Sequence, residues 1–63
     1  MTPSEKADEI FNKYLELYPE QDLYFVAKLA AIIAVDEIIN CIKIMPDTYI
    51  IYWVMVREEL NNY

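Results

Sequence analysis

The sequence lacks glycine and histidine entirely and contains a single cysteine, Cys41. Glycine provides the positive φ angles of tight β-hairpin turns and phosphate-binding loops, so its absence disfavours both structures. Without histidine or a second thiol, the chain can form neither a Cys/His metal site nor an internal disulfide bond. These absences favour a helical protein that uses no metal ion and no cofactor.

Basic residues are scarce as well: five lysines and arginines stand against eleven acidic residues, which gives a net charge of −6. Non-specific DNA binding and adsorption to anionic membranes both require a basic surface, so the charge argues against both partners. The longest apolar run, residues 23–35, is interrupted by Lys28 and is shorter than the roughly 20 residues of a bilayer span. The polar N-terminus does not resemble a secretion signal. We therefore expect a soluble, cytoplasmic protein.

The chain is short but rich in hydrophobic residues. Its 63 residues allow one domain, spanning 1–63, and a chain of this size buries only about 60% of the surface that its unfolded form exposes. Hydrophobic residues nevertheless make up 57% of the sequence, against a usual share of roughly 45–50%. Some apolar surface should therefore remain for another copy of the chain, and the sequence predicts a homo-oligomer.

Three helices are expected, at about residues 3–18, 23–44 and 48–61, which makes the protein an all-α, three-helix unit. The first has apolar residues at three- and four-residue spacing and a charged opposite side. Thr2 and Glu5 match a capping box, Pro3 suits the first helical position, and Glu9 and Lys13 can form an ion pair one turn apart.

Prolines separate the other two helices from their neighbours. A turn is predicted at residues 19–22, with Asp22 as the N-cap of the second helix, and a break is predicted around Pro46, with Asp47 or Thr48 as the next N-cap. The second helix is apolar nearly all round, which indicates a central position. Residues 49–56 also have the composition of a β-strand, but helix is preferred because there is no second strand to pair with.

The third helix has two apolar sides. One stripe should face the core of the unit, and it comprises Tyr49, Tyr52, Trp53, Val56, Leu60 and Tyr63. A single three-helix unit cannot cover both sides, so the other side is predicted to be the oligomer interface, formed by Ile50, Ile51, Val54 and Met55.

No catalytic arrangement is recognisable. The paired acids Asp36–Glu37 and Glu58–Glu59 lack the Glu-x-x-Glu spacing with which small helical pyrophosphohydrolases hold Mg²⁺, and are better explained as solvated acids pairing with Lys43 and Arg57. Cys41 has no histidine to activate it and is expected to be a buried, inert thiol. The sequence therefore predicts a protein that is not an enzyme.

Six tyrosines and one tryptophan are many for a chain of this length, and two interpretations stay open. Aromatic side chains pack in cores and subunit contacts, which is the favoured interpretation. They also stack on nucleobases while a nearby base binds the phosphate. The residues that could form such a ligand-binding site are Lys28, Lys43, Arg57, Tyr49 and Tyr52.

Residues 30–39, with their Ala-Val-Asp-Glu-Ile helix, and residues 52–60, from Tyr-Trp to Arg-Glu-Glu-Leu, resemble short helical proteins of tailed phages of gut-type bacteria, as do residues 2–7. The resemblance implies an oligomeric accessory protein, in the cytoplasm of an infected bacterium, that counters host immunity by binding. The first hypothesis is that it sequesters a signalling cyclic nucleotide at subunit junctions. The alternatives are an acidic inhibitor of a host defence protein, acting through Glu5, Asp8, Glu9 and Glu16, and a structural virion component.

Overall fold

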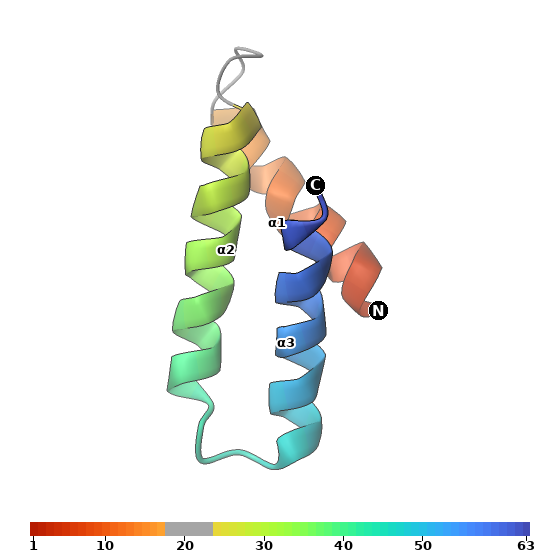
Figure 1. Ribbon diagram of the computed structural model, residues 1–63, viewed down its shortest axis with the longest axis vertical. Helices are drawn as coiled ribbons and strands as arrows, with labels where there is room; N and C mark the ends of the chain where they lie inside the picture. The colour runs from red at the N-terminus through yellow and green to blue at the C-terminus, as the bar shows by residue number, and fades with distance from the viewer. Residues whose placement is uncertain (18–23) are drawn as a thin grey trace.

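The computed structural model describes residues 1–17 and 24–63, and these residues form three α-helices without any strand (Figure 1). The helices are α1 (Pro3–Leu17), α2 (Tyr24–Cys41) and α3 (Asp47–Asn61). The predicted all-α, three-helix fold is thereby confirmed. The expected end of the first helix at residue 18, the turn at 19–22 with its Asp22 cap, and the start of the second helix at residue 23 lie outside the described residues.

The start of α1 follows the sequence signals. The Thr2 backbone N–H donates to Glu5 Oε1 at 2.9 Å, and the Glu5 N–H donates back to the Thr2 hydroxyl at 3.2 Å, which is the predicted capping box. Glu9 lies 2.9 Å from Lys6 Nζ and 3.8 Å from Lys13 Nζ, so the predicted Glu9–Lys13 pair is present and Lys6 adds a shorter one. These local interactions fix the first helix before any tertiary contact is considered.

The junction between α2 and α3 differs from the prediction. The second helix ends at Cys41 rather than at residue 44, and a turn follows in which the Met45 N–H donates to the Ile42 carbonyl. Pro46 displaces the preceding residue, Met45, from helical backbone angles, so the helix cannot continue through this segment. Pro46 itself occupies the N-cap of α3, so the predicted Asp47 cap was wrong.

Thr48 was also wrong as an N-cap, because Asp47 and Thr48 both lie in the first turn of α3 and no side-chain hydrogen bond caps this helix. Proline at the cap keeps an extended ψ of 147°, and the Tyr49 N–H donates to the Pro46 carbonyl. Asp47 still stabilises the helix start through its negative charge, which interacts favourably with the positive end of the helix dipole.

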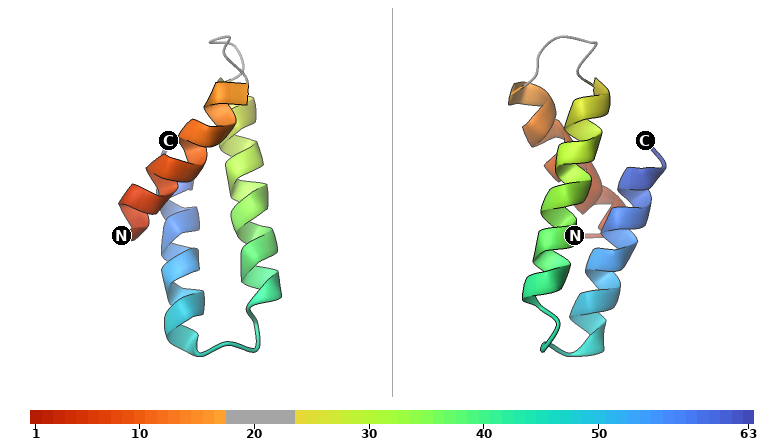
Figure 2. Two further views of the ribbon diagram at one scale, coloured as in Figure 1. Left: turned by 180° about the vertical axis from the view of Figure 1, so that it is seen from behind. Right: turned by 60° about the vertical axis from the view of Figure 1, so that its left-hand side comes forward.

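The helices α2 and α3 run antiparallel and form a hairpin, joined by the short connection at residues 42–46 (Figure 1). Helix α1 crosses one face of this hairpin, and the view from behind shows it lying over that face (Figure 2). The opposite face of the hairpin carries no further helix from the described part of the chain. The fold therefore has two layers, and one side of the second layer is uncovered.

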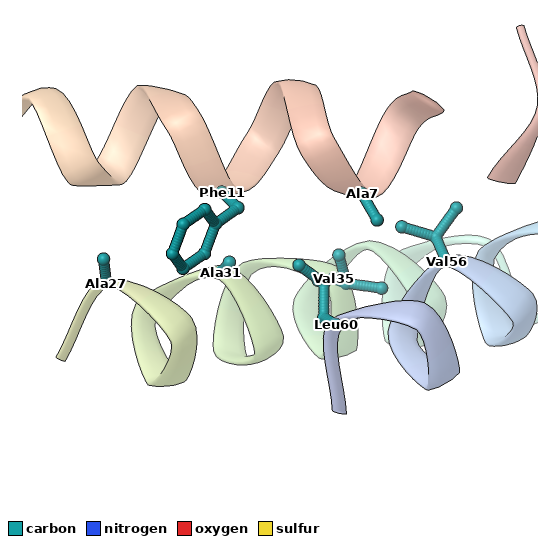
Figure 3. Close-up of a cluster of buried hydrophobic side chains, with 7 residues drawn as sticks. All are labelled: Ala7, Phe11, Ala27, Ala31, Val35, Val56 and Leu60. Atoms are coloured by element: carbon teal, nitrogen blue, oxygen red, sulfur yellow. The ribbon is translucent and has the colours of Figure 1, made fainter. Parts of the chain in front are cut away.

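The core between the layers is small. Its members come from all three helices and point toward one another (Figure 3): Ala7, Phe11, Ala27, Ala31, Val35, Val56 and Leu60. Phe11 points from α1 toward Ala27 and Ala31 on α2, whose small side chains allow the two helices to approach closely. The Phe11 ring also contacts the rings of Tyr24 and Tyr63, at centroid distances of 4.8 and 4.7 Å.

The expected central position of the second helix is not realised within one chain. Only one stripe of α2 is buried, at Ala27, Ala31 and Val35, because two neighbouring helices can cover only part of its circumference. Large apolar side chains elsewhere on α2 are exposed: Phe25, Val26, Leu29 and Ile33.

Candidate interaction surface

An ion pair joins the two helices of the hairpin and serves to identify its uncovered side. Arg57 on α3 donates to Asp36 Oδ1 on α2 at 2.7 Å, and both side chains are partly exposed. Phe25, Leu29 and Ile32 precede Asp36 at three- and four-residue spacing and so share its side of α2, while Ile50 and Val54 share the side of Arg57 on α3. We call these five apolar residues and the ion pair the hairpin face.

The hairpin face lies away from α1. On α3, contact with the α1 end of the chain is made by Tyr52, whose hydroxyl donates to the Met1 carbonyl at 3.2 Å. Tyr52 lies on roughly the opposite side of α3 from Val54, since two residues along a helix correspond to a turn of about 200°. On α2, the side that contacts α1 carries Ala27 and Ala31. The hairpin face is therefore the outer side of the second layer.

Exposed apolar side chains are abundant on and around this face. Phe25 is 63% exposed and Leu29 is 42% exposed, Ile50 and Val54 are half-buried, and Ile32 is half-buried with part of its side chain packed against the core. Monomeric proteins seldom expose extended apolar patches, so this surface is the candidate site of interaction.

The four residues predicted for an oligomer interface all lie outside the core. Ile51 and Met55 are exposed on the outer side of α3, while Ile50 and Val54 belong to the hairpin face. The inward stripe of the same helix was predicted correctly for Val56 and Leu60, which are fully buried, and for Tyr52, Trp53 and Tyr63, which pack against the core. Tyr49 departs from it and is 55% exposed, because it lies in the first turn of α3 beyond the reach of α1. The role of these residues in an oligomer remains a prediction.

The five predicted ligand-binding residues do not gather at one place in a single chain. Lys28 lies near the start of α2 and Lys43 lies beyond its end, so at about 1.5 Å per helical residue they are on the order of 20 Å apart. Arg57 is on α3 beside Asp36, and Tyr52 packs edge-on against Trp53 with a centroid distance of 5.5 Å. A site that used all of them would have to combine residues from different subunits.

Two of the three bases have structural partners within the chain. Lys28 Nζ donates to the backbone carbonyl of Asn61 at 3.1 Å. The last carbonyls of a helix lack intrahelical partners, and a cation there also interacts favourably with the helix dipole. This contact explains a lysine within an apolar segment, and no local pattern could have revealed it. Arg57 binds Asp36, whereas Lys43 is exposed within the α2–α3 connection.

Cys41 is exposed at the end of α2, so the expected burial of its thiol was wrong. The last turn of α2 extends past the region where α1 crosses the hairpin, and its outer residues meet solvent. Among the described residues there is no pocket and no group of three potential metal ligands, and none of the three helices combines the length and hydrophobicity that crossing a membrane requires.

Acidic side chains concentrate on α1. Glu5, Asp8 and Glu16 are exposed there. Hydrogen bonds from the backbone and the side chain of Thr2 lower the pKa of Glu5, and the hydrogen bond and charge of Lys6, with a smaller effect of Lys13, lower the pKa of Glu9. The outer side of the first layer is therefore negatively charged at neutral pH.

No family model, no curated protein and no solved structure matches this chain.

Proposed function

We propose that this protein acts by binding rather than by catalysis, as a homo-oligomer, and that it is a phage accessory protein which neutralises a host process. The observation that carries the proposal is the apolar surface of α2 and α3, where Phe25, Leu29, Ile33, Ile51 and Met55 are exposed around a two-layer fold. A surface this apolar is stabilised by contact with another protein surface. The resemblance to short phage proteins supplies the biological setting of the proposal.

The proposed ligand is a signalling cyclic nucleotide held where subunits meet. Lys43 and Tyr49 support it, because both are exposed, Lys43 within the connection between α2 and α3 and Tyr49 in the first turn of α3 after it. An ammonium group can bind a phosphate while a tyrosine ring stacks on the base. Lys28 and Arg57 would have to exchange their partners, Asn61 and Asp36, for the phosphate, so Lys43 is the base that can act without any rearrangement.

Native mass spectrometry tests the proposal directly. The purified protein is measured alone and with a panel of cyclic mono-, di- and trinucleotides, and a discrete oligomer that gains a fixed number of nucleotides is the expected result. Lys43→Ala should abolish nucleotide binding without dissociating the oligomer. Lys13→Ala is the matched control, because Lys13 is an exposed lysine on α1 and its side chain is 74% exposed. A discrete oligomer that binds no nucleotide would remove this ligand.

A second candidate function is capture of a basic host protein, and the exposed acids of α1 favour it. Glu5, Asp8 and Glu16 lie on the layer that does not form the hairpin face, so they stay available in an oligomer built through α2 and α3. Complementary charges accelerate association with a basic partner and make it dependent on salt. Charge reversal of Asp8 and Glu16 should then abolish capture, and unchanged capture by that double variant would exclude this candidate.

A further inference from the structure

We propose that the hairpin face is the docking surface for a second copy of this chain, so that two α2/α3 hairpins pack face to face and the two α1 helices lie on the outside. The inference rests on the self-association in the proposed function and is independent of the ligand. It adds Phe25 and Leu29 of α2 to the interface residues that the sequence analysis names on α3.

The small core indicates that the protein covering the hairpin face stays bound to it permanently. Of the seven buried residues in the described part of the chain, three are alanines and two are valines, and only Phe11 and Leu60 are larger. The other large apolar side chains that pack against this core are only partly buried. Two of the apolar side chains on the hairpin face, Phe25 and Leu29, are meanwhile exposed. A domain this small gains little from its own core and commonly relies on association for stability. A second copy is present whenever the chain itself is made, whereas a transient partner is not.

Charge favours the same occupant. Two copies that each carry a net charge of −6 repel one another, and the exposed acids of α1 would oppose contact through the first layer. The hairpin face contains one acid, Asp36, and Arg57 neutralises it at 2.7 Å. Residues 24–35 contain no acid at all. On α3, the exposed acids Asp47 and Glu58 border the face, at three and four residues from Ile50 and Val54. The acid-free part of this surface is therefore its α2 side, where two identical acidic chains can approach without facing like charges.

The ion pair gives the interface a specific feature. Asp36 and Arg57 are part-buried in one chain and would be enclosed when a second hairpin covers them. An enclosed ion pair adds little to affinity, but losing one partner leaves an uncompensated charge in an apolar contact. A twofold arrangement would bring the two ion pairs to equivalent positions, since the same patch is then used on both subunits.

Thiol labelling tests the docking surface one position at a time. In a Cys41→Ser background, Phe25→Cys and Leu29→Cys each place one thiol on the hairpin face. Ile44→Cys places one within the α2–α3 connection, at a position that is 96% exposed. The rate of reaction with a maleimide is measured over a range of protein concentrations, together with the sedimentation of each variant. Circular dichroism confirms that each variant retains its helices.

We expect the thiols at positions 25 and 29 to become protected as the chains assemble, by about tenfold when nine in ten chains are paired, because only the unpaired fraction reacts. Ile44→Cys should react at the same rate at every concentration. Equal rates at all three positions in an assembled protein would overturn the docking surface and leave self-association intact. A wild-type chain that sediments as a monomer at every concentration would overturn both, whereas protection without nucleotide binding supports the interface and removes only the ligand.

Discussion

The two phenylalanines of this chain provide a matched pair of perturbations. Phe11 is 4% exposed and contacts the rings of Tyr24 and Tyr63, whereas Phe25 is 63% exposed on the hairpin face. Phe11→Ala and Phe25→Ala are chemically the same change, so any difference in their effect reports the surroundings of the side chain. We expect the first to destabilise the isolated fold and the second to weaken only the contact between copies.

The magnitudes follow from burial. Replacing a core phenylalanine by alanine costs about 3–5 kcal/mol, while a 63-residue chain has a total stability of roughly 3–9 kcal/mol at about 0.05–0.15 kcal/mol per residue. Phe11→Ala should therefore remove a third or more of the free energy of unfolding, and it can unfold the chain. For Phe25, covering the exposed 63% of a side chain worth about 1.5–3 kcal/mol when fully buried gives about 1–2 kcal/mol per chain.

Urea denaturation followed by circular dichroism, at several protein concentrations, separates the two effects. With a slope of about 1 kcal/mol per molar urea, Phe11→Ala should lower the midpoint by about 3 M or abolish the transition, and it should do so at every concentration. Phe25→Ala should lower the midpoint only where the wild-type chain is assembled, and its effect should fade on dilution. Equal losses for the two variants at all concentrations would refute the distinction between core and interface.

Three smaller perturbations test other contacts. The Tyr63 hydroxyl is buried without a hydrogen-bond partner among the described residues. Tyr63→Phe should therefore leave the free energy of unfolding unchanged or raise it by about 1 kcal/mol, as measured by the urea midpoint. A clear loss of stability would show that the hydroxyl has a hydrogen-bond partner. Because the pKa of Glu5 is lowered from 4.5 in the folded chain, the stabilising effect of Glu5 is present above pH 4.5 and is lost as the pH falls through the folded-state pKa. Thr2→Ala should lower the free energy of unfolding by about 1 kcal/mol at neutral pH and reduce its dependence on pH. An unchanged pH profile would contradict the capping box. Arg57→Ala should lower the free energy of unfolding by about 0.2–1 kcal/mol in dilute solution, where the pair with Asp36 is partly exposed, and by more where chains assemble. Sedimentation and unfolding at two protein concentrations measure the two effects. Equal losses at both concentrations would argue against enclosure of the ion pair.

The parts of this fold that the sequence predicts well depend on neighbours in the chain. The capping box of Thr2 and Glu5 and the Glu9–Lys13 pair involve residues three or four positions apart, so the sequence contains all the information that they need. The burial of Val56 and Leu60 was predictable for a related reason, since helical periodicity alone assigns them to one side of α3.

The parts that sequence reasoning missed depend on where the helices lie relative to one another. Lys28 binds the Asn61 carbonyl, 33 positions away in the sequence, and nothing within one turn of Lys28 points to that contact. Cys41 shares a sector with buried alanines, yet it is exposed because the covering helix ends short of it. Pro46 signalled a break between α2 and α3, but its direct effect is on the preceding residue, and α2 ends five positions before it at Cys41.

The composition of α2 connects the fold to the proposed assembly. A helix that packs on one side needs an apolar stripe of about 100°, and α2 has that stripe in Ala27, Ala31 and Val35. Its further apolar residues, Phe25, Leu29 and Ile33, are not required by α1 or α3, and in a monomer they would only lower solubility. A third neighbour is needed to cover them, and the described part of the chain supplies only two. The apolar excess of α2 is thus explained if its third neighbour is a helix of another copy. The central position that the sequence indicates for this helix is then a property of the assembled protein.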